Sequence, residues 1–361
     1  MISLLSSRLH PLRHAGNEAH LAFFPSELTV SEVILVILVF IGRQALHLVG
    51  LGNQFQIKTG SGGDGGSYEL PELAVSMPFR FTEAYLGLYA AALNTGSEAS
   101  VAYNDPKVLL DSAAKMCVLL SAFSEPAMLL VLGHHRSPVR PLGAVNVRNK
   151  FDVLRPDLCT ADVLMKGRCG VVARLVRQAR RVKRGLEIDV VVEIVSYEEE
   201  PVVVVYRQVF TMLQFMRSNK RIGVSAKQKD DLSIDELARQ AKSRPFTMTM
   251  SSPTAWARVC KDYNPIHMSK VAAKIFGFRS TIAHGNHALA VALEQFESNH
   301  DFSCDTKDKP FSMEVQFRKP IVLPATLGAL IVQEGDYNYS FFLKQKNKIC
   351  VSASLSQAED R

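Results

Sequence analysis

A long apolar helix followed by a series of strands is predicted twice in this chain, and this recurrence constrains the fold most strongly. Apolar residues recur at helical spacing over residues 107–121 and again over 283–296. After each helix come segments in which apolar and polar residues alternate, as they do in strands with one buried face. Strands that follow one another without intervening helices form antiparallel sheets, so the chain belongs to the α+β class.

The two series of strands are similar in order, and each contains a short segment that is similar in sequence to one in the other. Val145-Asn146-Val147-Arg148 precedes Pro156 in the first, and Val315-Gln316-Phe317-Arg318 precedes Pro324 in the second. We therefore expect two antiparallel sheets, each wrapped around one long helix. The predicted strands are 144–151, 161–167, 171–179, 186–195 and 202–210, then 246–250, 313–318, 326–333, 337–345 and 349–355.

The composition along the chain suggests where these units begin and end. A glycine-rich stretch at 60–66 is typical of a flexible linker, and residues 217–245 are polar and charged. The predicted organisation is an N-terminal extension at 1–67, a first folded unit at 68–216, a linker at 217–245 and a second folded unit at 246–361.

The N-terminal extension contains an apolar run at residues 33–42. The run is shorter than the roughly 20 residues that span a bilayer, and its extension to Leu51 includes Arg43 and His47. Three interpretations stay open: a membrane anchor, a buried or interfacial helix, and a signal-type segment. Membrane association through residues 29–51 is therefore one expectation. Arg8, Arg13 and the scarcity of acids before position 20 favour a mitochondrial or membrane-associated location over a cytoplasmic one.

The net charge of +7 favours partners that carry phosphate or other anionic groups. No nucleic-acid partner is expected, because the chain has no zinc-knuckle spacing, no RNP-like aromatic motif and no long basic tail. The basic stretch 174–184 is either the solvated face of a hairpin or a docking patch for an acidic carrier or for cofactor phosphates. The six cysteines contain no CxxC pair, and no ligand spacing indicates a metal site.

The densest group of reactive side chains lies between Lys261 and His267. Pro265 biases Asn264 away from helical conformation, so the chain turns there. The turn directs Asp262 and His267 toward one place, where a carboxylate and an imidazole can share a water molecule as an acid–base pair. The amide of Asn264 orients a ligand or braces the loop.

A second segment, Ala283-His284-Gly285, supplies what this pair lacks. It precedes the second apolar helix, whose first-turn N–H groups have no acceptor within the helix and can stabilise negative charge on a thioester oxygen. Gly285 allows a substrate to approach the backbone closely. His284 is expected to brace the start of the helix. Together the two segments indicate addition of water to an enoyl thioester, or its removal from a 3-hydroxyacyl thioester.

The run from Asp262 to His267, followed by Gly277-Phe278 and Ile282–Gly285, closely resembles the signature of MaoC-like, or (R)-specific, enoyl-CoA hydratases. The resemblance is specific over about 255–325 and looser over 140–215. It implies a double hotdog fold, with Asp262 and His267 as the catalytic pair. Asn264, Gly285 and His284 fall at the expected oxyanion and substrate-binding positions.

The first half has no matching pair, its nearest segment being residues 103–106. The resemblance therefore implies a degenerate first hotdog that shapes an acyl-chain tunnel, and one active site in the second. Two residues depart from the family pattern: Lys261 stands where glycine is usual, and Asn286 where an apolar residue is frequent.

The expected function is that of a hydro-lyase that acts on trans-2-enoyl and (R)-3-hydroxyacyl thioesters in fatty-acid metabolism. The expected partners are acyl-CoA or acyl-carrier protein, with no metal or other cofactor, and a homodimer is one expected state. The alternative is a non-catalytic acyl-thioester binding or assembly subunit, which Lys261 and the degenerate first half would suit.

Overall fold

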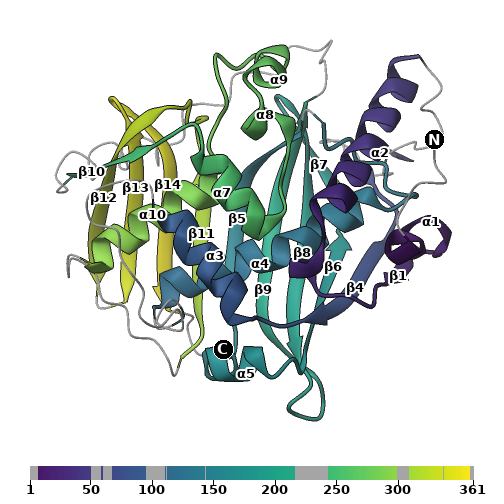
Figure 1. Cartoon of the computed structure of the whole chain (residues 1–361), viewed down its shortest axis with the longest axis horizontal. Coiled ribbons are helices and arrows are strands. Elements are labelled where there is room, and N and C mark those ends of the chain that lie inside the picture. Colours follow the sequence, from purple (N-terminus) through teal and green to yellow (C-terminus); the bar gives the residue numbers. More distant parts are fainter. Residues whose placement is uncertain are drawn as a thin grey trace.

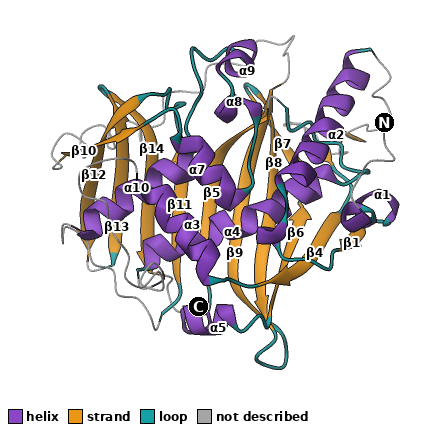
Figure 2. Cartoon of the chain, viewed as in Figure 1, coloured by secondary structure: helices purple, strands orange, loops and turns teal. Residues whose placement is uncertain are grey.

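Helices cover one side of a single large sheet that curves across the whole molecule (Figures 1 and 2). The structure is a computed structural model, and it describes residues 7–49, 58–59, 67–94, 110, 112–142, 144–215, 243–298, 309–335 and 337–357. The main path of the sheet is β1-β4-β6-β8-β9-β5-β11-β14-β13-β12-β10, and the short strands β2, β3 and β7 extend it at one side.

The strands fall into two sets of five, of which the first comes from the first half of the chain. These strands are β4 (Leu73–Phe79), β5 (Ala144–Val153), β6 (Cys169–Leu175), β8 (Gly185–Ser196) and β9 (Val203–Phe215). The second set is β10 (Ser243–Met248), β11 (Phe311–Phe317), β12 (Ala325–Gly335), β13 (Asn338–Gln345) and β14 (Lys348–Gln357). The short strands are β1 (Glu18–His20), β2 (Lys58–Thr59), β3 (Ser67–Glu69) and β7 (Gln178–Val182).

The order of strands in space is the same in both sets. In the first set it is β4-β6-β8-β9-β5, and in the second it is β10-β12-β13-β14-β11. The sets meet where β5 pairs with β11, so that Arg148 lies opposite Gln316 and Asn149 opposite Val315. The two segments that echo each other in sequence are thus neighbouring strands at the junction, and the predicted repeat is confirmed.

Each set wraps one long helix. In the first half this helix is α4 (Ala113–Gly133), and in the second it is α10 (Gly285–Ser298). Among the described residues, α4 is the helix long and apolar enough to cross a membrane, but 89% of its apolar window is buried inside the protein, as in a core helix. Polar groups join the two helices: Lys115 Nζ lies 2.8 Å from a Glu294 carboxylate oxygen and 2.6 Å from one of Glu297.

Further helices and turns complete the structure. They are α1 (Pro11–His14), α2 (Val30–Leu48), α3 (Glu83–Leu93), α5 (Ala161–Met165), α7 (Ser252–Cys260), α8 (Pro265–Met268) and α9 (Lys270–Ile275), with 3-10 turns η1 (Ser7–Leu9), η2 (Pro25–Glu27) and η5 (Pro156–Leu158). The apolar N-terminal run forms α2, which packs against α4 through Val33, Val36 and Phe40.

The structure corrects three predicted elements. Residues 161–167 are not a strand, because Thr160 caps the first turn of α5 by accepting from the N–H of Val163. Residues 171–179 divide between β6 and β7. The predicted helix 107–121 continues to Gly133, beyond Pro126, while residues 107–109 and 111 lie outside the described residues.

Three further predicted features also lie outside the described residues: the glycine-rich stretch 60–66, residues 103–106, and most of the linker 217–245.

Candidate active site

The turn around Asp262 begins where α7 ends. Lys261 closes this helix with φ 57° and ψ 12°, the left-handed conformation that normally favours glycine. The Oδ1 atom of Asp262 then accepts from the N–H of Asn264 at 3.0 Å, and Oδ1 of Asn264 accepts from the N–H of Ile266 at 3.3 Å. Asn264 therefore braces the loop by capping α8, which Pro265 opens.

The hydrogen bonds of His267 fix which ring nitrogen is available. Nδ1 of His267 lies 2.7 Å from the carbonyl oxygen of Ile282, and because a carbonyl only accepts, Nδ1 carries the proton. In the neutral ring Nε2 is then a bare acceptor. It lies 3.8 Å from Oδ2 of Asp262, too far for a direct hydrogen bond and suitable for a shared water.

His284 lies closer to the pair than its predicted role of bracing the helix start requires. Its Nε2 donates to the carbonyl oxygen of Asp262 at 3.0 Å and lies 3.5 Å from Oδ2 of the same residue. Its ring stacks on that of His267, with centroids 3.8 Å apart. His284 thus fixes both the backbone of Asp262 and the plane of the His267 ring.

The surroundings of Asp262 and His267 lower the pKa values of both side chains, which favours the forms that can accept a proton. Burial raises the pKa of Asp262, but the hydrogen bond and charge of His284, the charge of His267 and the N–H of Asn264 outweigh it and lower the pKa below its usual range. Burial, together with the charge of His284, lowers the pKa of His267. At neutral pH the site therefore holds an aspartate anion beside a neutral imidazole.

Asp262, His267 and His284 also bring three potential metal ligands within 4.8 Å of one another. The hydrogen bonds argue against that use. Nε2 of His284 donates its hydrogen to the Asp262 carbonyl and so has no lone pair to offer a cation in this ring orientation.

Gly285 begins α10 beside this group and lies under the ring of Phe317. A Cβ atom built on Gly285 would lie 2.2 Å from Cε1 of Phe317, so no larger residue fits unless that ring moves. The next residue, Asn286, accepts from Nδ2 of Asn149 at 3.0 Å and donates to Ser121 at 3.2 Å. The side chain of Asn286 therefore connects α10 to β5 and α4 by hydrogen bonds.

A cavity of about 290 Å³ joins the two segments. Asp262, Asn264, His267, His284 and Gly285 all line it, so the structure brings the five predicted site residues to one place. At this cavity lie also three basic residues, of which Arg184 and Lys319 are exposed and Arg318 is partly buried. The site thus combines an acid–base pair, a helix N-terminus and positive charge.

Glu125 is a residue of this cavity that the sequence interpretation missed. It lies on α4, is buried, and burial together with the charge of Asp262 raises its pKa well above the usual range. A single acid within a predominantly apolar helix was the available signal. The raised pKa favours the protonated carboxyl group, which can donate a hydrogen bond into the cavity.

Residues 233–353 match the MaoC like domain. The 3-hydroxyacyl-thioester dehydratase X of Mycobacterium tuberculosis is 29% identical over 231 residues, which cover 63% of this chain and 72% of that protein.

Two solved structures show the same fold. The crystal structure of HtdX of Mycobacterium tuberculosis superposes with a TM-score of 0.55 at 22% identity, covering 80% of this chain and 100% of that one. A MaoC-like dehydratase from Phytophthora capsici gives a TM-score of 0.53 at 15% identity, covering 81% and 97% respectively. These similarities confirm the predicted α+β double hotdog class.

Proposed function

We propose that the chain is a hydro-lyase that interconverts trans-2-enoyl and (R)-3-hydroxyacyl thioesters in fatty-acid metabolism, and the match of residues 233–353 to the MaoC like domain is the premise of this proposal. The observation that carries the proposal is the bare Nε2 of His267, which faces Oδ2 of Asp262 across 3.8 Å on the wall of the cavity.

In the hydration direction, a water held between Asp262 and His267 attacks C3 of the enoyl thioester. The water loses a proton to Nε2 of His267, a new C–O bond forms at C3, and the electron pair of the double bond moves toward the thioester oxygen. The N–H of Gly285 at the start of α10 stabilises that oxygen. The enolate then takes up at C2 the proton that Nε2 of His267 had accepted, so that one water is added overall and the imidazole is neutral again. Dehydration follows the same steps in reverse.

The substrate handle is an acyl-CoA or an acyl-carrier protein. The exposed cations Arg184 and Lys319 at the cavity support this proposal. In either handle, the arm that carries the thioester ends in a phosphate group, which such cations can bind.

We propose further that the reaction needs no metal or other cofactor. The donor role of Nε2 in His284 supports this, as does the acid–base pair, which is sufficient to activate water. Activity that survives dialysis against EDTA is the expected result.

The alternative function, a non-catalytic acyl-thioester subunit, was suggested by Lys261 at the usual glycine and by the degenerate first half. Lys261 adopts the left-handed conformation that glycine would take, and the hydrogen bonds of the loop are formed. This supports the enzyme over the alternative.

The test of the proposed function is hydration of crotonyl-CoA and longer enoyl-CoA substrates by the purified chain, with carrier-protein thioesters in parallel. Turnover that depends on Asp262 is expected. Tight acyl-CoA binding without turnover would select the non-catalytic subunit.

A membrane-surface contact through residues 29–51 is supported by the outer face of α2. Its exposed residues include Val30, Ile34, Leu38, Ile41 and Leu46. Sedimentation with liposomes, compared with a variant in which Ile34 and Leu38 are replaced by serine, tests the contact. The proposed homodimer is tested by analytical ultracentrifugation.

A further inference from the structure

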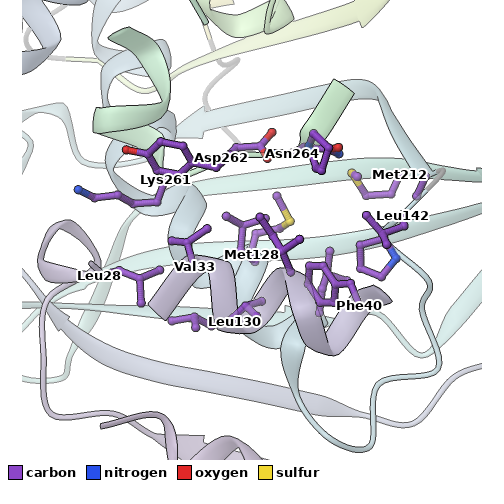
Figure 3. A pocket seen from close by; sticks show the side chains of 18 residues that line it. Leu28, Val33, Phe40, Met128, Leu130, Leu142, Met212, Lys261, Asp262 and Asn264 are labelled. Atoms are coloured by element: carbon purple, nitrogen blue, oxygen red, sulfur yellow. The ribbon is translucent and has the colours of Figure 1, made fainter. Parts of the chain in front are cut away.

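A second, apolar cavity of about 60 Å³ lies between α2 and the loop that carries Asp262. Figure 3 shows Lys261, Asp262 and Asn264 on one side of it and Val33 and Phe40 of α2 on the other. Because α2 belongs to the N-terminal extension, this wall lies outside residues 233–353, which match the MaoC like domain.

The lining of this cavity favours an apolar ligand. Among the described residues that line it, only Lys261 and Asp262 are charged, and the ammonium group of Lys261 lies 5.6 Å from the centre of the Tyr85 ring. The other lining residues are aliphatic or aromatic apart from Asn264, and they include Val33, Ile37 and Phe40 of α2. Such a lining suits a hydrocarbon chain and does not suit a phosphate.

The apolar cavity adjoins the active-site cavity. Met128, Ala144, Met212, Asp262 and Asn264 line both. The two methionines at the boundary have flexible thioether side chains, which adapt to a chain that passes between them. When the thioester lies at Gly285 and His267, its hydrocarbon chain can therefore extend from the active-site cavity into the apolar cavity next to α2.

Polar contacts stabilise the start of α2 within the N-terminal extension and hold the end of the helix against α4. Near its start, Glu32 accepts from the N–H and hydroxyl of Thr29 and lies 3.7 Å from Arg8. Near its end, Arg43 donates to the carbonyl oxygens of Leu132, Gly133 and His134 at the C-terminus of α4. The middle of α2, with Val36, Ile37 and Phe40, lines one side of the cavity.

We propose that the acyl chain of the substrate extends under α2, and that the inner face of this helix determines how long a chain the enzyme accepts. The proposal rests on the proposed function for the identity of the substrate. It assigns to the N-terminal extension a part in specificity: α2 binds the end of the hydrocarbon that is remote from the reacting carbons.

Three variants test the proposal. Ile37→Trp fills the cavity, and Phe40→Ala opens it. Leu38→Trp is the matched control, since Leu38 is 51% exposed on the outer face of the same helix. The first measurement is kcat/KM for crotonyl-CoA and for trans-2-dodecenoyl-CoA with each variant.

Ile37→Trp is expected to lower kcat/KM for the dodecenoyl substrate by about tenfold or more, and to leave the crotonyl substrate within about twofold of the unmodified chain. Phe40→Ala is expected to raise the ratio of long-chain to short-chain kcat/KM, and Leu38→Trp to leave it unchanged. Equal effects of Ile37→Trp on both substrates, together with an unchanged ratio in Phe40→Ala, would overturn the proposal.

A binding measurement separates this proposal from the proposed function. Isothermal titration of lauroyl-CoA, which has no double bond to hydrate, is made in the Asp262→Asn background with and without Ile37→Trp. Affinity weakened by about tenfold by Ile37→Trp supports the acyl site even if no turnover is found. Unchanged affinity overturns it even if the chain is an active hydratase.

Discussion

Oδ2 of Asp262 and Nε2 of His267 face each other across 3.8 Å, with the proton of His267 held on its other ring nitrogen by the carbonyl of Ile282. Both groups are thus fixed in the protonation states that accept a proton from water. Either group alone would lack the partner that positions this water or takes up its proton.

We therefore expect His267→Ala and Asp262→Asn each to lower kcat for crotonyl-CoA hydration by about 10²- to 10⁴-fold, the usual range for loss of an acid–base group. The double variant should be little slower than either single variant, because the two residues act on one water. His14→Ala, at an exposed position, is the control. Full activity in either single variant would show that the substituted residue is not needed for hydration.

Burial should make the stability of the chain sensitive to acid. His287 donates to the carbonyl oxygen of Ala92 at 2.7 Å and stacks on Trp256, and burial lowers its pKa to about 3. Below about pH 6.5 the unfolded chain takes up a proton that the folded chain does not, so acid favours unfolding. Each such histidine makes the free energy of unfolding fall by up to about 1.4 kcal/mol per pH unit until the folded pKa is reached.

Urea unfolding of the unmodified chain and of His287→Leu, at several pH values between about 4 and 7, measures this slope. The variant should show the shallower dependence on pH, whatever its absolute stability. Parallel curves for the two proteins would mean that His287 does not contribute.

Lys261 offers a test of backbone strain, because its φ of 57° lies in the left-handed region. Lys261→Gly and Lys261→Ala both remove the side chain, but only glycine adopts this conformation without cost. The glycine variant should therefore be more stable than the alanine variant by about 1–2 kcal/mol in urea unfolding. Both should keep the hydrogen bonds of the loop and hence measurable hydration activity. Equal stabilities would show that the loop relaxes.

The effects of substitutions at Gly285 and Phe317 on activity should depend on each other, because the two residues are in contact. The Cβ atom of Gly285→Ala would lie 2.2 Å from the Phe317 ring, so this variant should lose both stability and activity although it keeps the backbone N–H. Adding Phe317→Ala should restore a substantial part of the activity by making space. If the double variant is no more active than Gly285→Ala, the ring is not the cause of the loss.

The charged cluster between α4 and α10 should be costly to break. Lys115→Met leaves the carboxylates of buried Glu294 and partly buried Glu297 without their cation, which should destabilise the chain by about 3–5 kcal/mol. Adding Glu294→Leu and Glu297→Leu should recover part of this loss, because the uncompensated charges are then gone. Thermal unfolding of the three proteins provides the comparison.

Much of this arrangement follows from local sequence. Alternation identifies most strands because each has one buried face, and Pro265 fixes the turn that brings Asp262 and His267 together. The predicted strand at 161–167 is wrong because a capping threonine, Thr160, starts a helix there in spite of the apolar content.

Other parts depend on contacts distant in sequence. Glu125 reaches the active-site cavity from the first half, and Phe317 covers Gly285 from a strand that follows α10. The side of α2 that is buried is determined by where α4 lies, which the helical spacing of α2 alone does not specify.

The pairing of β5 with β11 has a consequence during synthesis of the chain. β5 is complete once residue 153 has emerged from the ribosome, but its partner on that side, residues 311–317, emerges only after the whole turn from Asp262 to His267. Throughout that interval the nascent first half presents an unpaired strand edge with buried-type side chains, which is a template for aggregation. Chaperone binding to ribosome-bound chains should therefore be strongest before β11 appears and should fall once it has emerged.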